Sequence, residues 1–89
     1  MDAADFLSFL NAERQETIGM LNDENLACDP VPFPAGGDDQ HARRMIARLR
    51  KETEYAFSSA LFKEEAAHLY VRLTTVNAQI ILFLTNPAT

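Results

Sequence analysis

Two combinations of residues in this sequence have the types and spacing needed for metal binding or catalysis. Glu65 and His68 are three positions apart, so on a helix their side chains would share one face. Di-iron helical bundles use such Glu-x-x-His pairs together with single glutamates from other helices, so two copies of the chain could complete a site with Glu13 or Glu16. We expect instead that Glu65 and His68 form a polar border beside an apolar helix face, with Arg72 as a neighbour, and that no metal or other cofactor is bound.

The second combination is a potential nucleophile with two potential bases. Cys28 is the only cysteine, and the two histidines are His41 and His68. Neither histidine belongs to a recognisable catalytic motif, and the sequence contains no Gly-x-Ser-x-Gly and no phosphate-binding loop. We therefore expect that the protein is not an enzyme.

The predicted location is the cytoplasm. A lone cysteine gives no internal disulfide and fits a reducing compartment. No basic segment precedes Phe6, so we expect no secretory signal. The apolar run at residues 80–84 is much shorter than the roughly 20 residues that span a bilayer, so we expect no membrane contact.

Length and charge indicate one small domain with two complementary halves. The 89 residues are 47% hydrophobic and 24% charged, a composition typical of a folded domain of marginal stability. Residues 1–40 contain nine acidic side chains and one basic one, a net charge of -8, whereas residues 41–89 contain seven basic and four acidic ones, a net charge of +3. We expect the halves to pack on each other, although the acidic half could face a basic protein. The overall charge of -5 argues against direct nucleic-acid binding.

The strongest helical pattern runs from Tyr55 to Phe83, and the helix that it predicts covers residues 59–84. Apolar or small residues recur there at alternating steps of four and three, as along one face of a helix: Tyr55, Ser59, Phe62, Ala66, Leu69, Leu73, Val76, Ile80 and Phe83. Residues 80–84 are apolar all the way round, so a second chain is expected to cover them. The predicted dimer or partner interface is Phe62, Leu69, Leu73, Val76, Ile80 and Phe83. The apolar and β-branched residues at positions 69, 71, 73 and 75 also alternate, which leaves a β-hairpin over residues 69–84 that turns near Asn77 and Ala78 as an alternative.

Two further helices are predicted, at residues 3–22 and 40–57. Asp2 or Asp5 can cap the first, and Arg14 and Thr17 interrupt its apolar stripe in the middle. The second has an apolar stripe that we expect to be buried: Ala42, Met45, Ile46, Leu49, Ala56 and Phe57. A break is expected at Ser58 and Ser59, where either serine could cap the third helix, although a helix continuous from residue 40 to residue 84 is the alternative.

The loop at residues 23–39 and the basic face after it supply the remaining candidate contacts. Pro30, Pro32 and Pro34 impose an extended path on the loop. We expect Phe33 to pack on the helices, with insertion into a partner as the alternative. Arg44 and Arg48 belong to a run of five bases that we expect to be a solvated face paired with the acidic half, with contact to an acidic partner as the alternative.

The sequence therefore predicts an all-α protein, a single domain over residues 1–89 that forms a small three-helix bundle completed by dimerisation. The expected function is that of a small acidic protein–protein interaction module. It would act as an inhibitor, anti-activator or regulator by masking the surface of a larger protein, such as a transcription regulator or a defence complex. The alternative function is a ferritin-like metal-binding half-bundle that assembles as a dimer.

Overall fold

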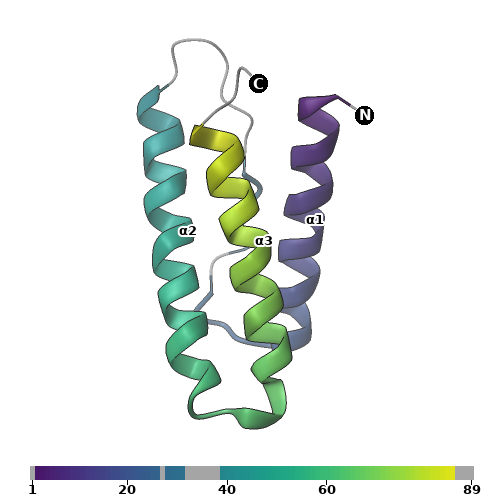
Figure 1. Ribbon diagram of the computed structural model, residues 1–89, viewed down its shortest axis with the longest axis vertical. Coiled ribbons are helices and arrows are strands. Elements are labelled where there is room, and N and C mark those ends of the chain that lie inside the picture. The colour runs from purple at the N-terminus through teal and green to yellow at the C-terminus, as the bar shows by residue number, and fades with distance from the viewer. Residues whose placement is uncertain (1, 27, 32–38, 86–89) are drawn as a thin grey trace.

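The computed structural model describes residues 2–26, 28–31 and 39–85, and all regular secondary structure in these ranges is helical (Figure 1). The elements are α1 (Ala3–Leu21), α2 (Asp39–Ala60), the short 3-10 helix η1 (Glu64–Ala66) and α3 (Ala67–Thr85). The prediction of an all-α fold with three principal helices is confirmed. The alternative of a β-hairpin in residues 69–84 is wrong, because these residues form a continuous α-helix.

Helix α3 lies between α1 and α2 and packs against both (Figure 1). The chain descends through α1, returns to the starting end, descends again through α2 and ascends through α3. Helices α1 and α2 are therefore parallel to each other and antiparallel to α3. The described part of the connection, residues 22–26 and 28–31, passes on the far side of α3 in this view.

Side-chain and backbone caps fix the ends of α1. The side chain of Asp2 accepts a hydrogen bond of 2.8 Å from the backbone N–H of Asp5, which satisfies one of the free donors of the first turn. At the other end Asn22 has a left-handed backbone conformation with a φ of 51°. Its backbone N–H donates hydrogen bonds to the carbonyl oxygens of Ile18 and Gly19. Asparagine tolerates this conformation better than most residues, so it ends the helix.

The connection between α2 and α3 differs from the predicted one. The break was expected at Ser58 and Ser59, but α2 continues through both serines to Ala60. The carbonyl of Ser59 then accepts hydrogen bonds from the backbone N–H groups of Phe62 and Lys63, at 3.0 and 2.9 Å. These bonds close the helix end and place the turn three residues later than the sequence suggested. Helices α2 and α3 are therefore separate, as predicted, but with the boundary moved.

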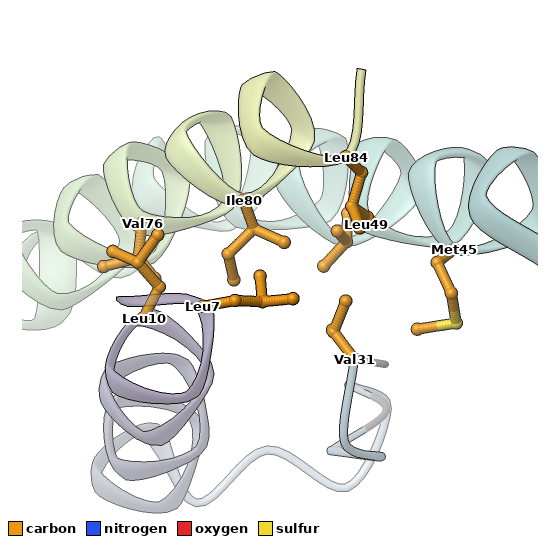
Figure 2. Packing of buried hydrophobic residues seen from close by; sticks show 8 residues of the cluster. All are labelled: Leu7, Leu10, Val31, Met45, Leu49, Val76, Ile80 and Leu84. Atoms are coloured by element: carbon orange, nitrogen blue, oxygen red, sulfur yellow. The ribbon is translucent and has the colours of Figure 1, made fainter. Parts of the chain in front are cut away.

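One hydrophobic cluster occupies the end of the bundle where α1 and α2 begin. Figure 2 shows that its side chains come from all three helices and from the loop, and point toward one another. The cluster consists of Leu7, Leu10, Val31, Met45, Leu49, Val76, Ile80 and Leu84. Val31 lies in this cluster, so this part of the loop packs on the helices. Phe33 lies outside the described residues.

A second hydrophobic cluster occupies the opposite end of the bundle, near the turn between α2 and η1. It consists of Ile18, Leu26, Ala56, Tyr70 and Leu73. Leu26 brings the first part of the loop into contact with this end. The loop is thereby held at both ends of the bundle.

Ion pairs join the acidic N-terminal half to the basic C-terminal half. Arg48 lies 2.7 Å from a carboxylate oxygen of Asp29. Arg72 pairs with Glu13 and lies 4.0 Å from Glu16. The prediction that the two halves pack on each other is confirmed. Each pair is partly solvent-exposed, so each contributes little to the free energy of folding.

The segment Glu64–Thr85 is the one part of the described residues that is long and apolar enough to cross a membrane by length and composition. The core helix of a soluble protein passes the same test. In this fold Leu73, Asn77 and Ile80 of the segment are fully buried against α1 and α2. Its apolar character therefore has an explanation within the bundle along this side of the helix.

Candidate interaction surface

The turn between α2 and η1 exposes the two most accessible large apolar side chains of the described residues. Leu61 is 72% exposed and Phe62 is 86% exposed. The hydrogen bonds to the Ser59 carbonyl hold the backbone of Phe62 in the turn, so the ring lies beyond the end of α2. We call Leu61 and Phe62 the turn patch. Contiguous exposed apolar groups of this kind commonly mark binding sites.

Charged groups surround the turn patch. Phe62 lines an open depression of about 540 Å³ together with Lys63, Glu64 and Glu65. Both glutamates are exposed in η1. The hydroxyl of Tyr70 is the main group that raises the pKa of Lys63 above its usual value, with smaller contributions from the charges of Tyr70, Tyr55 and Asp23. Lys63 is exposed as well, so the rim of the depression carries one positive and two negative side chains.

A second apolar surface lies between α2 and α3. Phe57 and Val71 are exposed there, and they line a shallow recess of about 110 Å³. Tyr70, Thr74 and Thr75 also line this recess. The recess contains no charged side chain, so any ligand or protein that covers it would make apolar contacts.

A buried polar layer separates the two hydrophobic clusters. Arg14 is fully buried and forms a forked pair with Glu52, with Nε and Nη2 each donating to one carboxylate oxygen at 2.8 Å. Nη1 of Arg14 donates to the backbone carbonyl of Asp29 at 2.7 Å and to Oδ1 of Asn11 at 3.2 Å. Helix α1, helix α2 and the loop are therefore tied together by one guanidinium group.

Asn77 adds α3 to this polar layer. Its Nδ2 donates to Glu52 at 2.9 Å and approaches the hydroxyl of Thr53 at 3.4 Å. Its Oδ1 is buried without a hydrogen-bond partner among the described residues. Each polar member lies between apolar core residues of its own helix, so a change of register would leave a charge unpaired in the core. The layer fixes how the three helices are aligned.

A smaller polar contact holds the start of the loop on α2. The Tyr55 hydroxyl donates to Asp23 at 2.7 Å, and the backbone N–H of Asn25 donates to the same carboxylate at 2.9 Å. Burial alone would raise the pKa of Asp23, but these hydrogen bonds and the positive charge of Lys63 outweigh it and leave the pKa below its usual value.

The residues predicted as a dimer or partner interface occupy different environments. Leu73 and Ile80 are fully buried and Val76 is nearly so, and all three contact other residues of the same chain. They form the core side of α3 and offer no surface to a second chain in this fold. The other three are Phe62, which is exposed, Leu69, which is half-buried, and Phe83, which is half-buried with its ring centroid 5.5 Å from that of Phe6.

The remaining candidate residues are dispersed over the bundle. Arg44 is exposed on α2, and Arg48 on the same helix is paired with Asp29. Glu65 in η1 and His68 at the start of α3 are both exposed, which agrees with a polar border. The described residues contain no group of three or more His, Cys, Asp and Glu side chains placed to hold a metal ion.

The buried polar layer was missed in the sequence, although its positions carry a signal. Glu52 falls three residues after Leu49 and four before Ala56, which is the spacing of the buried stripe itself. Asn77 likewise falls four residues after Leu73 and three before Ile80, a spacing of the buried side of α3. A polar residue at a stripe position on each of three helices indicates buried polar partners.

No family model, no curated protein and no solved structure matches this chain.

Proposed function

We propose that this protein is a small helical interaction module that binds a larger protein through the turn patch and regulates or inhibits it by covering part of its surface. The observation that supports the proposal is the exposure of Leu61 and Phe62 on a turn that backbone hydrogen bonds hold in place. An exposed side chain on a fixed backbone loses little conformational freedom when it binds. In this proposal the chain acts by occupying a surface and carries out no reaction.

The chemistry of the turn patch defines the kind of surface that would receive it. Full burial of Leu61 and Phe62 would contribute about 3 to 6 kcal/mol together. A micromolar complex has a standard free energy of about -8 kcal/mol, so contacts around the patch must supply the rest. Glu64 and Glu65 adjoin Phe62. The expected receptor is therefore an apolar pocket bordered by lysine or arginine, and its association rate should fall as salt is added.

The experiment compares proteins captured from an extract of the source cells by the immobilised wild-type chain and by the Leu61→Ser/Phe62→Ser variant. Phe9→Ser is the matched control, because Phe9 is a half-exposed aromatic residue on α1. Both substitutions remove exposed side chains, so circular dichroism should show the wild-type helix content in each. We expect at least one protein that the wild type and Phe9→Ser retain and that the double variant retains at least tenfold less.

A captured protein would then be purified and titrated by calorimetry against the same three chains. The proposal predicts that one chain binds one molecule of the captured protein and that the Leu61→Ser/Phe62→Ser variant does not bind. At low salt, Glu64→Gln/Glu65→Gln should bind more weakly than the wild type. It would be overturned if the double variant captured the same proteins as the wild type. It would also be overturned if the turn patch bound phosphatidylcholine–phosphatidylglycerol vesicles in a flotation assay and no protein, since the patch would then contact a membrane.

A further inference from the structure

The side of α3 that faces away from the core carries four exposed residues in a regular row. Val71 and Leu82 are 61% and 64% exposed, and Thr75 and Ala78 between them are exposed as well. Their spacing of four, three and four residues places them on one line along the helix. We call these four residues the outer stripe. Helix α3 has no charged residue after Arg72, so the stripe lies on an uncharged helical surface.

We infer that a second copy of this chain covers the outer stripe, with the two α3 helices antiparallel. The order of side chains along the stripe is large, small, small, large, and its spacing is the same when it is followed from either end. The two-fold axis would lie between the two α3 helices, at the level along each helix that is midway between Val76 and Asn77. It therefore pairs Val71 with Leu82 of the second copy, and Thr75 with Ala78 of the second copy. A surface that is complementary to itself in this way is what an isologous dimer requires.

The small residues at the centre allow the two helices to approach closely. Thr75 and Ala78 lie nearest to the two-fold axis, where bulky side chains would hold the helix axes apart. At either end Leu82 of one copy lies over Val71 of the other, next to the uncharged recess lined by Phe57 and Thr74. The recess gives each Leu82 side chain an apolar surface to contact.

Charges on α2 support the same orientation. Glu52 is hydrogen-bonded to Asn77, which places Glu52 at the level of the proposed axis. Arg50 and Glu54 are exposed, two residues before and after Glu52. Phe57 lines the recess beside α3. Glu54 lies about one helical turn before Phe57 and Arg50 about two turns before it, so all three are on the same side of α2. Antiparallel pairing brings Arg50 opposite Glu54 of the second copy, and symmetry repeats the pair.

The size of a stable interface requires that each copy contributes part of α2 as well as the outer stripe. A stable interface covers about 600 to 1,000 Å² on each partner, which is at least roughly a tenth of the 5755 Å² that the chain exposes. Val71 and Leu82 are separated by eleven residues, or about 16 Å along the helix. The stripe alone is smaller than such an interface, so Phe57 and the charged pair on α2 must be part of it.

The first test is the native mass by light scattering and sedimentation equilibrium. The chain has a mass of 10.0 kDa, so the wild type should have about twice that mass at concentrations near 100 µM, and Ala78→Arg should have the mass of one chain. Ala12→Arg is the matched control, because Ala12 is exposed on α1, and it should remain dimeric. Circular dichroism checks that Ala78→Arg is folded, and Leu82→Glu is a second variant expected to be monomeric. A monomeric wild type at 500 µM, or a dimeric and folded Ala78→Arg, would overturn the inference.

The second test is the orientation, by disulfide cross-linking in a Cys28→Ser background. An equimolar mixture of Val71→Cys and Leu82→Cys chains should give a cross-linked heterodimer, whereas each variant alone should give little. In a parallel dimer Val71→Cys would instead cross-link to itself, and that result would overturn the antiparallel arrangement. This inference does not depend on the proposed function, because Leu61→Ser/Phe62→Ser should leave the dimer intact.

Discussion

Removing the charge of Glu52 should destabilise the fold more than almost any other conservative substitution. In Glu52→Gln the guanidinium of Arg14 stays fully buried between α1 and α2 but loses its counter-charge. Removal of one member of a buried ion pair costs about 3 to 5 kcal/mol, because the remaining charge cannot reach water. A domain of this length has a free energy of unfolding of about 4 to 13 kcal/mol. The substitution should therefore remove about a quarter of the stability or more.

The assay is urea denaturation at pH 7, followed by circular dichroism at 222 nm. For a domain with a denaturant slope of about 1 to 2 kcal/mol per molar urea, a loss of 4 kcal/mol moves the midpoint down by about 2 to 4 M. Glu24→Gln is the matched control, because Glu24 is exposed in the loop, and its effect should be within about 0.5 kcal/mol. A loss of less than 1 kcal/mol in Glu52→Gln would refute the argument.

A third variant separates the ion pair from simple loss of packing. In Arg14→Met/Glu52→Met/Asn77→Leu the whole polar layer is replaced by apolar side chains of similar length. Replacement of a complete buried ion pair is often neutral or stabilising, by up to about 4 kcal/mol. The triple variant should therefore be more stable than Glu52→Gln, although its helices should lose the unique alignment that the polar layer imposes, visible as broadened amide resonances. Equal destabilisation of the triple variant and Glu52→Gln would contradict this account.

Two further predictions concern α1 and the loop that follows it. Gly19→Ala should raise the free energy of unfolding by about 0.5 to 1 kcal/mol in the same urea assay, because alanine is the better helix former. A Cβ at Gly19 would meet no other atom within 4 Å. Unchanged or reduced stability would contradict this prediction. The folded-state pKa of Asp23 is lowered, so its contribution is present above its unfolded pKa of about 4 and is lost as the pH falls through its folded pKa. Asp23→Asn should thus cost about 1 kcal/mol at pH 7 and little at pH 2, and an equal cost at both pH values would contradict the assignment.

Much of the fold could be predicted from the sequence because helix periodicity and caps are local. The residue spacing and the cap at Asp2 indicated three helices, and α1 has nearly the predicted limits, whereas α3 begins at Ala67 and not at residue 59. The end of α2 was misplaced because serines favour caps but are also tolerated inside helices, and the Ser59 carbonyl closes the helix end three residues later.

Which side of α3 faces the core could not be decided from the sequence. Leu73, Val76 and Ile80 are apolar because α1 and α2 cover them, whereas Val71 and Leu82 are apolar on the opposite side and remain exposed. Both sets have helical spacing, so periodicity alone does not distinguish them. Phe57 is a similar case: it was expected to be buried but is 67% exposed, while Glu52 occupies the buried position. The charged side chain could be assigned to the core only once Arg14 was known to lie opposite it.

The native masses of three chains measured together test the account most directly. They are the wild type, the outer-stripe variant Ala78→Arg and the turn-patch variant Leu61→Ser/Phe62→Ser. If the outer stripe joins two copies and the turn patch is free for another protein, the wild type and the turn-patch variant are dimers and Ala78→Arg is a folded monomer. A turn-patch variant that is monomeric while Ala78→Arg remains dimeric would contradict the account, because the exposed turn would then be the surface that joins the two copies.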